Sequence, residues 1–356
     1  MRQFAVPFVA LVSLLGPSAN AGQPLSPPAL EAAAASAAGL QRLRSLLVSH
    51  KGAMVLERYF NGARATQPAN IKSASKSVIS ALVGIAVSRG LIEGVDQKIV
   101  DYFPELASDP EPKKGEITIE DLLTMRSGLE STSGRNYGAW VQSPNWVRFV
   151  LRRPLVDEPG TRVEYSTGTS HLLSAILTKA AKKSTWQFAQ EELATPLGFS
   201  LARWPQDPQG IYFGGNEMLM TPRQMVKFGE LYLNGGRIGD PQLIPRHWVE
   251  KSDDGVGRSR WGSDREYGYG FWIREFAGHR SFYAWGYGGQ FIFVIPGLDL
   301  VVVTTSRSDV SRERRDHLDQ IYGLVETLIG SNLVYHDSHR REVFGGEPHL
   351  LHAITN

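Results

Sequence analysis

The chain has 356 residues, with 38 lysines and arginines against 36 aspartates and glutamates, for a formal net charge of +2. The positive charges form no basic block, which argues against a nucleic-acid partner. The length suffices for one large domain or two closely packed ones. Because the chain has no cysteine, its stability must come from an apolar core rather than from disulfides.

The first residues have the pattern of a secretory signal peptide. Arg2 supplies a positive start, residues 4–15 form an apolar run, and residues 19–21 (Ala-Asn-Ala) form a small-residue cleavage site. The run is shorter than the roughly 20 residues of a spanning helix, and no cysteine is available for lipid attachment. We therefore expect a signal peptide over residues 1–21, no stable membrane anchor after its cleavage, and a periplasmic or secreted protein.

Strand patterns stand at both ends of the remaining chain. Residues 22–42 are rich in proline and then in alanine and predict a linker, although the alanines could also begin a helix. Two short apolar runs around Lys51-Gly52 are typical of a β-hairpin. The expected strands are 45–50, 53–59, 267–273, 281–285, 291–295 and 300–305, and an amphipathic helix is expected over 314–329.

The long middle of the chain is helical in character. The expected helices are 78–89, 119–125, 140–151, 170–181, 187–193 and 221–234. Strands at both ends with helices between them predict an α+β fold, in which an antiparallel β-sheet is flanked by helices. We expect a sheet subdomain of about 43–72 plus 266–335, a mostly helical inserted subdomain of about 73–265, and a C-terminal tail over 336–356.

The strongest chemical signal is the motif Ser73-Ala74-Ser75-Lys76, which opens a nearly uniformly apolar helix. Residues three apart on a helix share a face, so Lys76 can reach Ser73. A serine hydroxyl needs a neighbouring base to act as a nucleophile, and burial would favour the neutral lysine that such a base requires. A serine three residues before a lysine is nevertheless expected roughly once by chance in a chain of this length, as a capping serine and a solvated lysine.

Further motifs give this pair a context. They follow in order at residues 122–129, 159–168, 196–199, 231–236 and 286–290. With these motifs the chain resembles the β-lactamase-related serine hydrolases from about His50 to Ile329, and it is most similar to the 6-aminohexanoate (nylon oligomer) hydrolases and the esterases among them. The resemblance implies a β-lactamase/transpeptidase-like fold and no metal or organic cofactor.

The resemblance also assigns roles to individual residues. Ser73 matches the acylated nucleophile, Lys76 the lysine that activates it, and Tyr165 the tyrosine that relays a proton to the leaving group. The backbone amides of Ser73 and Gln290 match the oxyanion hole. Substrate contacts are expected at Tyr287, Gly289, Thr167 and Tyr137, although Tyr137 could equally be an exposed loop aromatic.

Two positions depart from the β-lactamase and peptidase pattern. Thr167 stands where asparagine is usual, and Tyr287 stands where lysine or histidine is usual. A cation at position 287 would help to bind a carboxylate, whereas tyrosine offers only a hydroxyl. The expected reaction is therefore hydrolysis of an ester or amide bond in a small molecule. A penicillin-interactive enzyme and a catalytically silent binding protein on the same fold remain as alternatives.

Other catalytic classes find less support in the sequence. The chain has neither a His-Glu-x-x-His pair nor a Gly-x-Ser-x-Gly elbow, which argues against a zinc hydrolase and an α/β-hydrolase. The polar tract at residues 336–339 is typical of a solvated tail rather than of a metal site. Trp261, Trp272 and Trp285 could line a cleft, although aromatic residues beside strands belong first to the core. The sequence makes no prediction of the oligomeric state.

Overall fold

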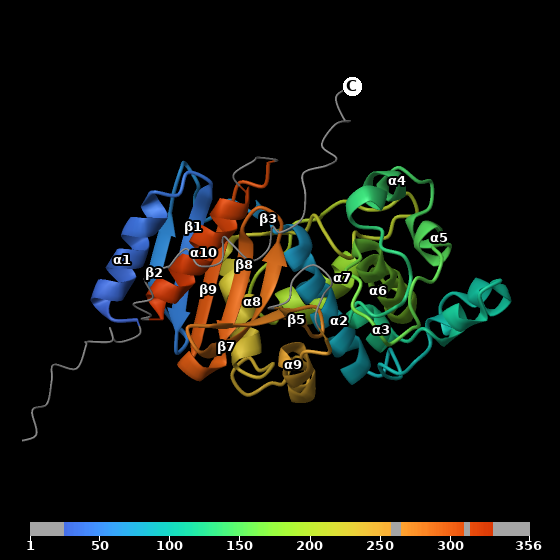
Figure 1. Cartoon of the computed structure of the whole chain (residues 1–356). Helices are drawn as coiled ribbons and strands as arrows, with labels where there is room; N and C mark the ends of the chain where they lie inside the picture. The colour runs from blue at the N-terminus through green and yellow to red at the C-terminus, as the bar shows by residue number, and fades with distance from the viewer. Residues whose placement is uncertain (1–24, 258–264, 310–313, 330–356) are drawn as a thin grey trace, which may run out of the picture.

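The computed structural model describes residues 25–257, 265–309 and 314–329, so the expected signal peptide and tail lie outside the described residues. In the described part an antiparallel sheet has the strand order β2-β1-β9-β8-β7-β6-β5. Strand β1 pairs with β9, so the two ends of the fold meet in one sheet (Figure 1). The predicted α+β class is confirmed. The strands are β1 (Leu43–His50), β2 (Ala53–Tyr59), β5 (Glu266–Tyr267), β6 (Trp272–Phe276), β7 (His279–Gly286), β8 (Gln290–Ile295) and β9 (Leu300–Ser306), with a separate ribbon of β3 (Ala69–Asn70) and β4 (Leu219–Met220).

The predicted hairpin at Lys51-Gly52 is present. His50 pairs with Ala53, and both turn residues have positive φ angles, 51° for Lys51 and 75° for Gly52. Two positive φ angles in a two-residue turn match the right-handed twist of the flanking strands. The conformation of the turn is therefore explained by the local sequence.

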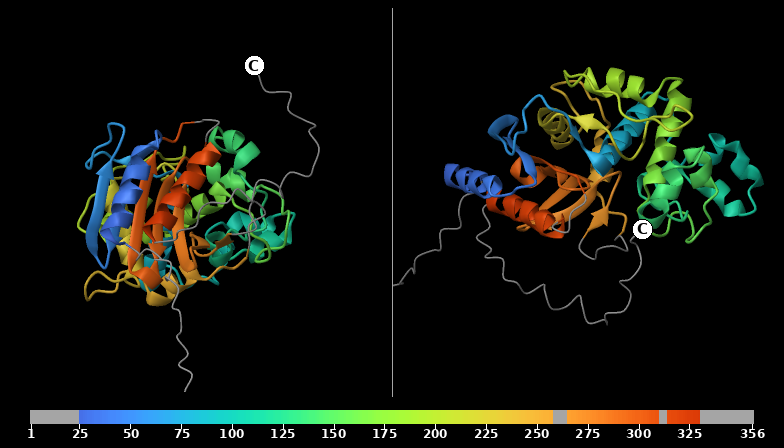
Figure 2. Two further views of the ribbon diagram at one scale, coloured as in Figure 1. Left: turned by 60° about the vertical axis from the view of Figure 1, so that its left-hand side comes forward. Right: turned by 90° about the horizontal axis from the view of Figure 1, so that it is seen from above.

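One face of the sheet is covered by helices from both ends of the chain. These are α1 (Pro27–Ala38) and α10 (Arg314–Leu328), which lie side by side in both views of Figure 2. The linker prediction for residues 22–42 is therefore wrong over α1. Ser26 caps this helix by accepting a hydrogen bond from the Ala29 amide, and Ala33 and Ala37, four residues apart, are fully buried.

The opposite face is covered by α8 (Pro222–Leu233), which contacts β1, β8 and β9. Gly229 brings the helix close to the sheet, because a β-carbon at this position would lie 2.6 Å from Val301. Helix α9 (Arg246–Asp253) also contacts the sheet, at β7. The predicted boundary of the helical subdomain at residue 265 is thus too late, since α8 and α9 pack with the sheet.

The remaining helices form the second part of the molecule around α2 (Ser75–Ser88), which is buried almost along its whole length and packs against α6 (Thr167–Ala181). The other helices here are α3 (Ile119–Leu123), α4 (Tyr137–Val141), α5 (Trp146–Leu151), α7 (Thr185–Ala189) and the π-helical η6 (Gln190–Ala194), with short 3₁₀ turns η2 (Ile99–Asp101), η3 (Pro104–Ser108), η4 (Pro112–Glu116) and η5 (Gly134–Asn136).

One helix expected from the sequence is in fact two. The single helix predicted over 140–151 divides into α4 and α5 at Pro144. Proline has no amide hydrogen to donate and disfavours helical geometry in the residue before it. Asn145 then starts α5 by accepting a hydrogen bond from the Arg148 amide at 2.8 Å.

None of the helices in the described ranges is long and apolar enough to cross a membrane.

Candidate active site

Ser73 lies in the 3₁₀ turn η1 (Lys72–Ala74), directly before α2, at the junction between the sheet and the helical part. Lys72 has a φ of 52°, a conformation that is costly for a residue with a side chain. It is held there because its amide donates to Asn70, its ammonium pairs with Glu217 at 2.9 Å, and its carbonyl accepts from Ser75 at 2.6 Å. Ser73 is thus presented by a fixed, strained backbone.

Lys76 lies one helical turn further on, with its Nζ atom 3.2 Å from Ser73 Oγ. The same nitrogen donates to the carbonyl of Gly215 at 2.7 Å and contacts Thr167 Oγ1 at 3.2 Å. Lys76 is only 3% exposed, and this burial holds its pKa well below the ordinary value for lysine. The arrangement places an amine that holds its proton more weakly than an ordinary lysine in hydrogen-bond contact with a serine hydroxyl.

Tyr165 lies on the other side of this pair. Its ring centroid is 4.8 Å from Lys76 Nζ, and its hydroxyl is hydrogen-bonded to Ser73. Burial raises the pKa of Tyr165, and the hydrogen bond with Ser73 offsets this only in part, so the phenol keeps its proton at neutral pH. Stacking on Trp272, with ring centroids 5.5 Å apart, fixes the ring.

Thr167 begins α6 two residues after Tyr165 and connects Lys76 to Ser133. Its Oγ1 atom lies 3.0 Å from Ser133 Oγ, and its backbone amide donates to the same oxygen at 2.9 Å. The side chain of Thr167 is buried beside Lys76 and does not line the neighbouring cavity. The structure therefore places Thr167 beside Lys76 rather than in the lining of the cavity.

Gln290 begins β8 next to η1, and its buried side chain clasps the backbone of Ser306 through two hydrogen bonds of 2.7 and 3.1 Å. These bonds fix the residue whose amide was expected in the oxyanion hole. The α-carbon of the neighbouring Gly289 faces Ser306, His317 and Ile321, so that a β-carbon there would meet these side chains. The Gly289 carbonyl accepts a hydrogen bond from the Thr304 hydroxyl. Gly289 thus packs toward α10 and is not among the residues of the cavity.

A cavity of about 640 Å³ opens beside Ser73 and Tyr165. Four of its twelve lining residues are aromatic, and of the three tryptophans proposed for a cleft Trp272 and Trp285 lie here, whereas Trp261 lies outside the described residues. Tyr287, predicted to contact substrate, also lines it. The lining residues are Ser73, Glu130, Ser131, Ser133, Gly134, Arg135, Asn136, Glu164, Tyr165, Trp272, Trp285 and Tyr287.

Tyr137 lies just outside this lining. Its ring packs edge-on against Trp140 with centroids 5.8 Å apart, and its hydroxyl accepts a hydrogen bond from Asn216 at 3.0 Å. It is half-buried, so it is not an exposed loop aromatic, and its neighbours Arg135 and Asn136 reach the cavity instead.

Two members of the site were missed in the sequence. Ser133 lies in a short polar loop with no recognisable motif, and Gly215 contributes only its carbonyl. Neither carries a sequence signal, because each acts through a contact between segments far apart in the chain. No cluster of side chains able to hold a metal ion occurs among the described residues.

Comparisons with known proteins agree with this fold. A search of curated proteins finds no match. A proposed 6-aminohexanoate-dimer hydrolase from Bacillus anthracis has a similar structure, with 22% identity, a TM-score of 0.66, and coverage of 80% of this chain and 79% of that one. A family VIII carboxylesterase (17% identity, TM-score 0.65, 85% and 99% coverage) and a penicillin-binding protein homologue from Caulobacter crescentus (15% identity, TM-score 0.65, 84% and 98% coverage) are similar as well.

These solved structures are similar in fold, and the model of one protein family extends the likeness to sequence. Its match runs from residue 33 to residue 325, which takes in the sheet, the helical part and every residue of the site described above. The chain belongs to the beta-lactamase family.

Proposed function

We propose that the protein is a serine hydrolase that cleaves an ester or amide bond of a small substrate through an acyl-enzyme on Ser73. The observation that carries the proposal is the contact of 3.2 Å between Ser73 Oγ and a buried Lys76 whose pKa is held low. A nucleophile in contact with a neutral base, beside a cavity, has the geometry that covalent catalysis requires.

In the proposed reaction, the Lys76 amine takes the hydroxyl proton while Ser73 Oγ attacks the substrate carbonyl carbon. The backbone amides of Ser73 and Gln290 hold the oxyanion. The bond to the leaving group then breaks as Tyr165 donates its phenolic proton to the leaving oxygen or nitrogen, and Lys76 returns a proton to Tyr165. Water attacks the acyl-enzyme by the reverse sequence and restores Ser73.

The cavity favours a neutral substrate with an apolar group. Its walls include Trp272 and Trp285, and Tyr287 supplies a hydroxyl rather than a cation. Arg135 is the one cation lining the cavity within the described ranges, and it is paired with Glu130 at 3.1 Å. A substrate carboxylate would therefore find, among the described residues of the cavity, no cation that is not already paired with a carboxylate of the protein. This supports ester or amide hydrolysis over the penicillin-interactive alternative.

The test is to incubate the protein with a fluorophosphonate and to map the adduct by mass spectrometry, alongside hydrolysis of p-nitrophenyl esters. We expect the adduct on Ser73, and loss of turnover in Ser73→Ala. Ser88→Ala is the matched control, because Ser88 lies at the far end of α2 and donates to the Ile85 carbonyl of its own helix. An unlabelled Ser73, or equal turnover in Ser73→Ala, refutes the proposal, and rapid nitrocefin hydrolysis would favour the penicillin-interactive alternative.

We also propose that the protein acts outside the cytoplasm, on the strength of the signal-peptide pattern at residues 1–21. Expression of the full chain in a bacterium should yield a periplasmic or secreted protein whose first residue is Gly22. An uncleaved protein confined to the cytoplasm would contradict this.

A further inference from the structure

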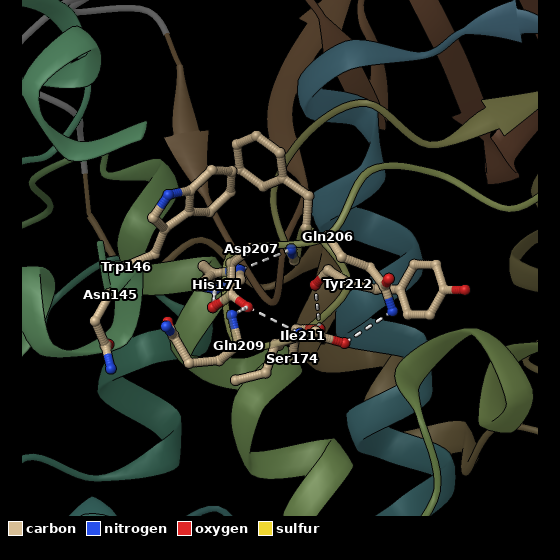
Figure 3. Close-up of polar contacts among 12 residues, drawn as sticks. Asn145, Trp146, His171, Ser174, Gln206, Asp207, Gln209, Ile211 and Tyr212 are labelled. Atoms are coloured by element: carbon tan, nitrogen blue, oxygen red, sulfur yellow. Dashed lines mark hydrogen bonds and ion pairs between the residues drawn. The ribbon is translucent and has the colours of Figure 1, made fainter. Parts of the chain in front are cut away.

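A fully buried histidine and aspartate lie behind the proposed base, outside the residues that the acyl-transfer steps use. His171 on α6 and Asp207 in the loop between η6 and β4 are both 0% exposed in their side chains, and His171 Nε2 lies 3.0 Å from Asp207 Oδ2 (Figure 3). Trp140, Trp146 and Phe213 surround the imidazole, with ring centroids 5.4 to 6.0 Å away. Polar groups buried among apolar side chains destabilise the fold unless their hydrogen bonds are satisfied.

The hydrogen bonds define the tautomer of His171. The backbone amide of Gly214 donates to His171 Nδ1 at 3.3 Å, so this nitrogen must be the acceptor. Nε2 therefore carries the proton and donates it to Asp207. Asp207 Oδ1 is held in turn by the amides of Gln209 and Ile211, at 2.8 and 2.9 Å, so the loop around the carboxylate is fixed (Figure 3).

Asp207 remains ionised in this setting. Burial acts to raise its pKa, but the hydrogen bonds from His171 and from the amides of Ile211 and Gln209, together with the charge that His171 carries when protonated, outweigh the effect of burial, and the pKa is lowered. Asp207 thus orients the imidazole by accepting the hydrogen bond from Nε2.

The residue after Gly214 is the one that contacts the base. Gly215 accepts a hydrogen bond from Lys76 Nζ at 2.7 Å, the shortest of the three contacts of that nitrogen described above. The segment fits tightly, since a β-carbon on Gly214 would lie 2.4 Å from the Ser170 carbonyl and one on Gly215 would lie 2.9 Å from Thr167. His171 therefore holds the backbone amide of Gly214 in place. The carbonyl of the next residue, Gly215, faces Lys76.

Counting protons on Lys76 shows why this carbonyl matters. A neutral amine has two N–H donors and one lone pair, and a carbonyl can only accept. The Gly215 carbonyl takes one N–H, and Thr167 Oγ1 can accept the second. The lone pair is then left for the proton of Ser73.

We propose that His171, oriented by Asp207, is a positioning residue that fixes the Gly214–Gly215 backbone and through it directs the lone pair of Lys76 at Ser73. This inference rests on the proposed function, because it gives Lys76 the role of base. It predicts that activity depends on the acceptor at Nδ1 more than on the donor at Nε2.

Two substitutions separate these atoms. In His171→Asn, the amide oxygen can replace Nδ1 and accept from Gly214, but Asp207 loses its partner. In His171→Gln, the longer side chain can replace Nε2 and donate to Asp207, but Gly214 loses its acceptor. Ser174→Ala is the matched control, since Ser174 lies one turn along α6 and its hydroxyl donates to the Tyr212 carbonyl of the same loop at 2.7 Å, while its β-carbon, which packs beside Gly214, is kept in alanine.

The readouts are kcat and KM for an ester, with the midpoint of urea unfolding measured in parallel. We expect His171→Gln to lower kcat about tenfold or more with little change in KM, because small misplacements of catalytic groups are costly. His171→Asn should lower kcat less than about threefold while being the less stable of the two, and Ser174→Ala should lose stability without losing kcat. If kcat simply follows stability across the three variants, the positioning role is refuted.

A second readout is independent of turnover. The titration of Lys76, followed by NMR of ¹³C-labelled lysine and assigned with Lys76→Arg, should shift toward the ordinary lysine value in His171→Gln, since a loosened segment admits water. It should stay near that of the wild type in His171→Asn and Ser174→Ala. An inert Ser73 would refute the proposed function alone, whereas identical Lys76 titrations in His171→Gln and the wild type would refute the positioning role.

Discussion

The backbone of Ile71 passes directly over Gly286, so closely that a β-carbon on Gly286 would lie 2.0 Å from the Ile71 carbonyl oxygen. This contact joins the strand that leads to Gln290 to the segment that leads to Ser73. The two amides expected to form the oxyanion hole belong to these two segments, and their separation is set where Ile71 and Gly286 meet.

Gly286→Ala tests this relationship. The added methyl group must push η1 away from β7, so Ser73 moves relative to Gln290, and we expect the rate of ester hydrolysis to fall about 100-fold, the scale on which the loss of one oxyanion donor acts. Gly297→Ala is the control, because its nearest neighbour would be the His279 ring at 3.9 Å, at the other end of β8. Equal hydrolysis rates in both variants, with both folded by circular dichroism, would mean that the contact does not set the site.

Tyr165→Phe removes one hydroxyl and keeps the ring that stacks on Trp272. Since the hydroxyl is hydrogen-bonded to Ser73 and stays protonated, we expect kcat to fall by about 100-fold or more, the usual range for a lost general acid. Tyr267→Phe is the matched control, as its ring lies edge-on to Tyr165 with centroids 6.2 Å apart. Leaving groups of low pKa need less protonation, so the loss should be smaller for p-nitrophenyl esters than for alkyl esters, and a uniform loss would argue against the acid role.

The grouping of Ser73, Lys76 and Tyr165 could be predicted because each stands in a short motif whose spacing brings side chains together within one turn or one helix start. Ser73 and Lys76 share a helical face, and the cap of α6 at Ser166 follows Tyr165 directly. Such relationships join residues that are close in the chain, so they can be predicted from the sequence alone.

Ser133, Gly215 and His171 could not be predicted in the same way. Their contacts join three segments that only the complete fold brings together, and Gly215 acts through a backbone atom that every residue possesses. The sequence could not predict that Gly289 faces away from the cavity either. Its position depends on the packing of α10, which brings His317 and Ile321 against it. The assignment of α8 to the helical subdomain failed for a related reason, since amphipathicity identifies a buried face but not the surface that buries it.

His317 should make the protein sensitive to acid. It is buried on α10 with Nε2 2.9 Å from Ser306 Oγ, and burial, aided by the charge of Arg42, lowers its pKa to about 4. Unfolding returns the pKa to about 6.5, so the unfolded state binds more protons between these values. The contribution of His317 to stability is then fully present above pH 6.5 and is lost as the pH falls toward 4, by at most about 1.4 kcal/mol per pH unit.

Urea unfolding at pH 7.5, 5.5 and 4.5 measures this loss. His317→Gln cannot titrate and can still bond to Ser306, so its free energy of unfolding should fall less steeply over the range than that of the wild type. Parallel curves for the two proteins would show that His317 does not contribute to the acid sensitivity.

Lys76 should give a pH dependence of the same sign at alkaline pH. Because burial holds its pKa well below 10.5 in the folded protein, the unfolded chain binds a proton that the folded protein lacks between the two values. Stability therefore rises with pH across this window, by up to about 1.4 kcal/mol per pH unit. Lys76→Met has no titrating group at this position and therefore lacks this contribution. Between pH 7.5 and 9.5 the free energy of unfolding, measured with urea, should increase more in the wild type than in the variant. Lys251→Met is the control, as that lysine is half-exposed and pairs with Asp254 at the surface. A wild-type curve that runs parallel to the Lys76→Met curve would place a charged Lys76 in the folded protein, and a charged lysine could not accept the proton of Ser73.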